Sequence, residues 1–178
     1  MLLFHKFMIK TIQNISDFLN KFISDLCFIF MAGMTFVVLL GVFFRYVMLS
    51  PLSWSEELSR YMMIWAASLA VSIGIKEKGH VGLTVLLDKA KSKFSIIFFE
   101  TIIFLTTFTF LAIMIYYSVK MVIDAKWQIS QGLGITMVLP TLAIPVSMIL
   151  ALIQLIFRYI LDIFSEKKDD EDIKIIDI

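Results

Sequence analysis

Charged side chains gather where two apolar stretches of the sequence meet, and ionic pairing is the chemistry that they could carry out. Arg45 ends the first stretch, and Glu56, Glu57 and Arg60 follow the proline turn that precedes the second. Glu56 and Arg60 stand four residues apart with the acid first, which is the favourable order for an ion pair on a helix. The cluster is either ordinary interfacial charge or a joint between two helices, and we expect Glu57 to be the member that contacts another protein.

The sequence offers no pattern for catalysis or for binding a metal or cofactor. It contains no H-E-x-x-H and no G-x-x-x-x-G-K, and its two histidines and single cysteine, Cys27, stand far apart. We therefore expect no catalytic, metal-binding, cofactor-binding or substrate-binding residue. The net charge of +1 gives no reason to expect a nucleic acid as partner.

The composition places the chain in a membrane. Hydrophobic residues make up 60% and charged residues only 17%, where a soluble domain would carry about a quarter charged residues. Three stretches lack acidic and basic side chains, at 26–44, 101–119 and 127–157. Each is long enough to cross a hydrocarbon layer of about 30 Å as a helix. An all-α integral membrane protein is predicted, and a freely soluble enzyme is excluded.

Helix-breaking residues divide the single membrane domain, residues 1–178, into four predicted transmembrane helices. These cover 22–46, 54–76, 95–120 and 138–161. Pro51 ends the first, and Ser53 with Glu56 has the spacing of a capping box, which predicts the start of the second. Gly132 and Gly134 mark the loop before the fourth helix, and Pro145 is expected to kink that helix.

Three flanking segments complete the predicted organisation. Residues 1–21 form either an interfacial amphipathic helix or an extension of the first span, and 80–93 form an amphipathic helix at the cytoplasmic face in contact with membrane lipids. Residues 165–178 form an acidic tail. Lysine and arginine are concentrated in the N-terminal segment, in the connection 76–93 and at the C-terminal end. The positive-inside rule therefore places both termini in the cytoplasm.

Two residues inside the predicted spans need a partner. Glu100 lies near the start of the third span, where it is a candidate for function by default or instead pairs with Lys76 or Lys93. Trp65 lies about 16 Å deeper than Trp54 at the helical rise, so its indole requires a hydrogen-bond partner or a protein interface.

Small residues at helical spacing predict faces where membrane helices approach closely, because such helices gain little from hydrophobicity when they associate. The predicted packing residues are Gly33 and Gly41 on the first span, Ala66, Ala70 and Gly74 on the second, and Ala143, Ser147 and Ala151 on the fourth.

One run of residues resembles a known family. It consists of Arg45-Tyr46, then Trp54-Ser55-Glu56-Glu57 with Arg60-Tyr61, then Trp65, and finally Gly79-His80. This pattern is similar to that of the small, DctQ-like membrane subunit of tripartite ATP-independent periplasmic (TRAP) transporters. Thr84 departs from the family, which often carries an aspartate there.

The resemblance implies a multi-pass subunit in a bacterial inner membrane, without cofactors. A periplasmic substrate-binding protein would deliver an organic carboxylate, such as a C4-dicarboxylate or a sialic acid. A large DctM-like subunit would move it by a sodium-coupled elevator motion, and the small subunit would brace the large one. The expected structural and partner-contact residues are Arg45, Trp54, Glu56, Glu57, Arg60, Trp65, Gly79 and His80.

An alternative from another class stays open at this point. The chain could be a self-contained small channel or exporter, in which Glu100 would handle the ion.

Overall fold

A computed structural model of the chain describes residues 2–77 and 93–176, and describes side chains over 8–77 and 98–162. The elements in chain order are α1 (Leu2–Tyr46), α2 (Ser55–Lys76), α4 (Lys93–Asp124), the short 3₁₀ helix η1 (Ala125–Trp127) and α5 (Val138–Ile176). The amphipathic helix predicted over 80–93, together with Gly79 and His80, falls outside the described residues except at its last position.

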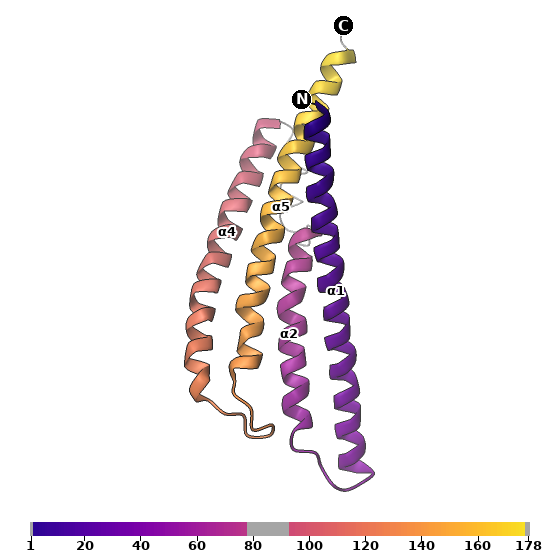
Figure 1. The fold of residues 1–178 in the computed structure, drawn as a ribbon, viewed down its shortest axis with the longest axis vertical. Coiled ribbons are helices and arrows are strands. Elements are labelled where there is room, and N and C mark those ends of the chain that lie inside the picture. Colours follow the sequence, from indigo (N-terminus) through magenta and orange to yellow (C-terminus); the bar gives the residue numbers. More distant parts are fainter. Residues whose placement is uncertain (1, 78–92, 177–178) are drawn as a thin grey trace.

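The four-span helical fold is confirmed. Four stretches of the described residues are long and apolar enough to cross a membrane: Met8–Tyr46, Ser55–Lys76, Phe98–Trp127 and Val138–Asp162. The first residues of α1 and the last of α5 lie at one end of the molecule, which we call the terminal end (Figure 1). The connections 47–54 and 128–137 lie at the opposite end, the loop end.

The helices stand side by side in the order α4, α5, α2, α1, so the molecule is closer to a layer than to a closed bundle (Figure 1). α5 packs between α4 and α2, and α2 packs between α5 and α1. α1 and α5 also meet near the terminal end, where Ser16 contacts Gln154. A layer of this kind leaves both of its outer helices, α1 and α4, with broad apolar surfaces for lipid or for another protein.

Small side chains on α5 form the centre of the packing. Ala143, Ser147 and Ala151 are all completely buried, as expected for a face where helices approach closely. Ala151 belongs to an apolar cluster with Ile75 of α2 and Leu111 of α4, so this face of α5 holds both neighbouring helices.

The small residues of α1 and α2 are used less uniformly. A side chain at Gly33 would meet Met62, and one at Gly41 would come within 2.7 Å of Ser55 Oγ, so both glycines allow α1 to approach α2. On α2, Ala66 is buried, but Ala70 is exposed and the space beside Gly74 is open.

Among the residues that the structure describes, Ala70 and Gly74 are therefore not packed against another helix. α2 lies between two helices, and its buried residues recur every third position, at Ala66, Leu69, Ser72 and Ile75, rather than along a single line four residues apart.

Helix boundaries differ from the expected ones at both ends of the chain. α1 runs without a break from Leu2 to Tyr46, which corresponds to the extension of the first span rather than to a separate interfacial helix. α5 continues beyond position 161 to Ile176, through most of the segment expected to be an acidic tail. Neither junction contains a proline or glycine that would end a helix.

Two alanines provide a matched test of this packing. Ala151→Leu forces extra volume into a fully buried position and should lower the free energy of unfolding by about 1–3 kcal/mol. Ala70→Leu adds the same atoms at an exposed position of α2 and should have little effect. Thermal unfolding of the two purified variants in one detergent measures the difference, and equal losses of stability would contradict the arrangement of α2 and α5.

Candidate functional site

The predicted charged cluster is assembled at the loop end, where α1 finishes and α2 begins. Arg45 Nη2 donates to Glu56 Oε1, which joins the last turn of α1 to the first turn of α2. The positions also suit the helix dipoles, since the cation stands at a C-terminus and the acid at an N-terminus. Both side chains are more than half exposed to solvent in the isolated chain, so in water the pair would contribute only about 0–1 kcal/mol.

The pair expected between Glu56 and Arg60 is not formed. Glu56 turns to Arg45 instead, and Arg60 is exposed without an ion pair among the side chains that the structure describes. An i,i+4 pair on a helix surface is a weak attraction, and a cation at the end of the neighbouring helix competes successfully for the same carboxylate.

The predicted capping box at Ser53 is also absent. The residue that caps α2 is Trp54, and it makes no side-chain capping hydrogen bond. Ser55 Oγ donates to the Leu52 carbonyl at 2.9 Å instead. Because the helix begins one residue later than the box requires, Glu57 rather than Glu56 takes the third helical position.

Glu57 holds the connection between α4 and α5. Its Oε2 accepts hydrogen bonds from the backbone N–H groups of Gly132 at 2.8 Å and Leu133 at 3.1 Å. Its Oε1 accepts a hydrogen bond from the Tyr61 hydroxyl at 2.5 Å. Hydrogen bonds to an ionised carboxylate are about twice as strong as those between neutral groups. We call this arrangement the Glu57 clamp; it uses, inside the chain, the carboxylate that was expected to contact another protein.

The connection is shaped to fit this clamp. Ile129 and Thr136 form an isolated antiparallel bridge, and Gly134 adopts a positive φ of 66°. A side chain at Gly132 would lie 2.7 Å from Glu57 Oε2 and 3.0 Å from the Ser53 carbonyl, so only glycine allows this approach. Gly132 and Gly134 indicate a loop in the sequence, but their spacing does not predict that a carboxylate of α2 binds this loop.

Trp65 makes both a hydrogen bond and an aromatic contact with neighbouring helices. Its Nε1 donates to the Leu139 carbonyl at the start of α5, at 3.2 Å. Its ring stacks on Phe30 of α1 with 5.7 Å between the ring centroids. One side chain of α2 thereby connects three helices in the half of the layer nearer the loop end.

A second set of polar contacts joins the helices at the terminal end, and of its members the sequence analysis named only Lys76, as a possible partner of Glu100. Lys76 Nζ pairs with Asp17 at 2.5 Å, and Arg158 Nη1 donates to the Ile75 carbonyl at the end of α2 at 2.9 Å. Ser16 Oγ donates to Gln154 Oε1 at 2.8 Å, and Gln154 Nε2 donates to the Ser16 carbonyl. Gln154 is completely buried, and such a lone amide in an apolar span is the signal that could have identified this contact.

Glu100 lies at the terminal end and not at the middle of the layer. It lines a shallow pocket between α4 and α5 together with Phe104, Arg158, Tyr159 and Asp162. Closer to the middle, the contacts between the same helices are apolar, with Leu111 against Met148. Within residues 8–77 and 98–162, no group of three histidine, cysteine, aspartate or glutamate side chains is placed to hold a metal.

Comparisons with known proteins agree with the resemblance. The family described as "Tripartite ATP-independent periplasmic transporters, DctQ component" matches residues 34–165. A TRAP transporter small permease protein of Haemophilus influenzae (strain Rd) is 39% identical over 77 residues, which are 43% of this chain and 48% of that protein.

Two further relatives are more distant. The sialic acid TRAP transporter permease protein SiaT of Haemophilus influenzae (strain 86-028NP) is 29% identical over 73% of this chain and 21% of its own length. The C4-dicarboxylate TRAP transporter small permease protein DctQ of Vibrio cholerae is 26% identical over 46% of this chain and 35% of its own length. The matched stretches thus span about half or less of each of these relatives.

The Glu57 clamp predicts a local effect of substitution. Glu57→Ala leaves the N–H groups of Gly132 and Leu133 without their acceptor, and hydrogen bonds to a charged group are stronger than those between neutral groups. Amide hydrogen exchange across 128–137 should therefore accelerate by about tenfold or more. Glu56→Ala removes the neighbouring exposed carboxylate and should leave exchange in this segment unchanged, and equal acceleration in both variants would refute the clamp.

Proposed function

The chain belongs to the DctQ component family of tripartite ATP-independent periplasmic transporters, and on this premise we propose that it braces a large permease subunit which moves the cargo. It is a multi-pass membrane protein, and a transporter subunit rather than an enzyme. The proposed transporter is sodium-coupled, depends on a periplasmic binding protein and takes up an organic carboxylate across a bacterial inner membrane.

The observation that carries the bracing role is where the polar side chains lie. Arg45, Glu56 and Glu57 hold helices and loop together at one end, and Asp17, Lys76, Gln154 and Arg158 do so at the other. Between the two ends, α5 meets its neighbours through small and apolar residues. An arrangement of this kind makes a stiff support, whereas a carrier needs polar groups at mid-depth to bind a charged solute.

The shape of the molecule supports a partner of larger size. A layer of helices with exposed apolar sides can add to the surface of a neighbouring membrane protein, which a closed bundle would do less well. The match with SiaT covers most of this chain but only 21% of that permease. A segment similar to this chain is therefore joined to a much longer sequence in that relative, which favours a large permease as the partner here.

The names of two relatives and the charge distribution of the sequence support the proposed substrate class and orientation. Sialic acid and C4-dicarboxylates appear in the names of two relatives, and both are carboxylates. The first residues of α1 and the last of α5 lie at the same end of the structure, as an even number of spans requires, and the distribution of lysine and arginine supports a cytoplasmic location for that end.

Reconstitution in proteoliposomes tests the division of labour. Under a sodium gradient, the chain with the large permease and binding protein should take up labelled sialic acid or C4-dicarboxylate. The chain by itself should give no more flux than empty vesicles, and the mixture lacking it should lose at least about nine-tenths of the uptake.

Glu100→Gln separates this proposal from the channel alternative. The variant should leave uptake by the complete system essentially unchanged, because Glu100 lies at the terminal end beside α5 and not on a path across the layer. Flux through the isolated chain that disappears in Glu100→Gln would show that the chain itself conducts and would overturn the bracing role.

A further inference from the structure

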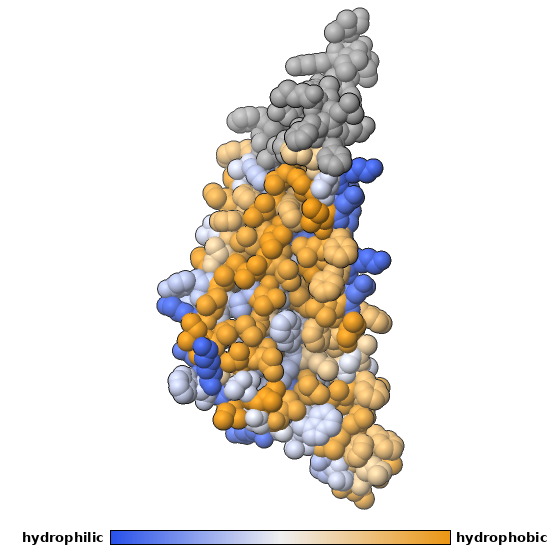
Figure 2. All heavy atoms as spheres, in the orientation of Figure 1, coloured by the Kyte–Doolittle hydropathy of each residue, from blue (hydrophilic) through white to orange (hydrophobic). Residues whose placement is uncertain are grey.

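A polar stripe runs along the outward side of α1. Lys10, Asn14, Asp17, Lys21 and Asp25 recur every three or four residues and all are exposed. The side of α1 that packs against the other helices is carried by different residues, among which Ser16, Ile23 and Val37 are buried. Figure 2 shows hydrophilic side chains along the edge formed by the upper part of α1, above an edge that is hydrophobic. Asp17 reaches Lys76 of α2 from this stripe, whereas Lys21 and Asp25 are exposed on the side of α1 away from its buried residues.

The depth of this stripe follows from α2. α2 has 22 residues, which at about 1.5 Å per residue is scarcely longer than a hydrocarbon layer of about 30 Å, so its two ends must lie at the two membrane faces. Antiparallel contacts align α1 with it: Asp17 pairs with Lys76, and Cys27 Sγ donates to the Ala66 carbonyl. Asp25 is accordingly level with about residue 68 of α2, roughly 12 Å inside the Lys76 end.

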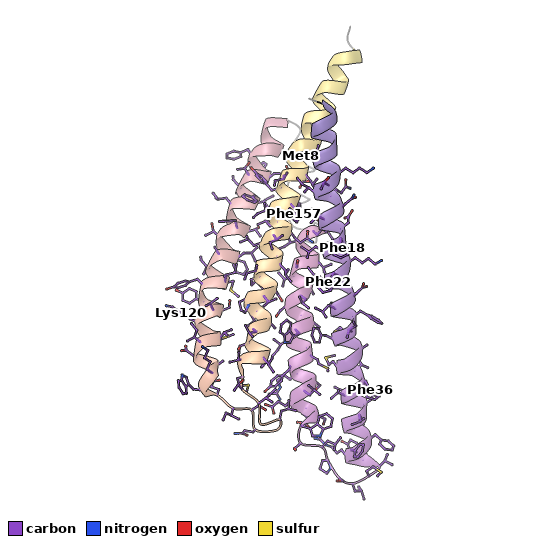
Figure 3. All side chains as sticks on the ribbon, in the orientation of Figure 1. Met8, Phe18, Phe22, Phe36, Lys120 and Phe157 are labelled. Carbon is purple, nitrogen blue, oxygen red and sulfur yellow. The ribbon has the colours of Figure 1, made fainter. Side chains whose placement is uncertain are left out.

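The surroundings of Asp25 on this side are apolar. Phe18 and Phe28 are each 73% exposed, Ile29 is 62% exposed, and Phe22 is also exposed (Figure 3 labels Phe18 and Phe22 on α1). Asp25 and Lys21 make no ion pair with any side chain that the structure describes. A lysine can extend its long stem toward the membrane face, but the short side chain of an aspartate cannot cover 12 Å. Facing lipid, the Asp25 carboxylate would stand in hydrocarbon without a partner.

We propose that a transmembrane helix of the large permease covers this outer face of α1, defined by Phe18, Lys21, Phe22, Asp25, Phe28 and Ile29, and places a lysine or arginine against Asp25. This inference rests on the proposed function and deepens it by assigning the contact surface. A partner with a complementary charge satisfies the carboxylate, whereas lipid tails offer no donor. A second copy of the chain, related by an axis along the membrane normal, would bring the same acid to the same depth and oppose like charges.

Assembly measurements test the charge contact. With a tagged large permease, Asp25→Leu should reduce the amount of this chain that co-purifies by at least about tenfold, and Asp25→Glu should retain most of it. Asp124→Leu removes an exposed acid near the end of α4 and should co-purify like the unmodified chain. The yield of each variant in the membrane fraction shows that insertion is preserved.

Photo-crosslinking locates the covered face independently. A photo-reactive residue in place of Phe22 should capture the large permease, while one in place of Phe110, an exposed residue of α4, should capture it less.

Capture of lipid alone or of a second copy at position 22, or full co-purification of Asp25→Leu, would overturn this inference and leave the proposed function standing. Failure of the unmodified chain to co-purify with any large permease would instead remove the proposed function itself, and this inference with it.

Discussion

The length of α2 is the constraint on which the rest of the structure depends. With 22 residues it can just cross a hydrocarbon layer, so it cannot tilt far or slide without drawing a charged end into the membrane. Ion pairs and hydrogen bonds fasten both of its ends, through Glu56 and Glu57 at one and Lys76 at the other. The remaining helices are longer; α1 and α5 pack directly against α2, and α4 is positioned through α5.

The polar contacts at both ends of the layer join helices and loops to one another. The Glu57 clamp ties the α4–α5 connection to α2, and Trp65 ties α1 and α5 to the same helix. The cost of leaving a carboxylate or an indole unpaired at the edge of a membrane makes such contacts stiffer than the same contacts in water. These contacts make a layer of helices that resists bending. The broad faces of the layer remain exposed for a neighbouring protein.

The sequence was sufficient to predict the four transmembrane helices, because length and apolar composition decide whether a helix crosses a membrane. It also marked the face of α5, since Ala143, Ser147 and Ala151 permit a close approach wherever the neighbour lies. It was not sufficient to predict the contact that Glu57 makes or the exposure of Ala70. Tertiary packing between distant segments decides which carboxylate binds the 128–137 connection and which side of α2 is covered. The local spacing of residues does not predict that packing.

The central claim is that this chain stays rigid while its partner moves the cargo. Spin labels at Leu39 of α1 and Ile113 of α4, on a Cys27→Ala background within the complete transporter, would report the width of the layer. The account predicts one narrow distance distribution that is the same with and without substrate and a sodium gradient. A shift of several ångströms on adding substrate would contradict it, because the chain would then take part in the transport motion.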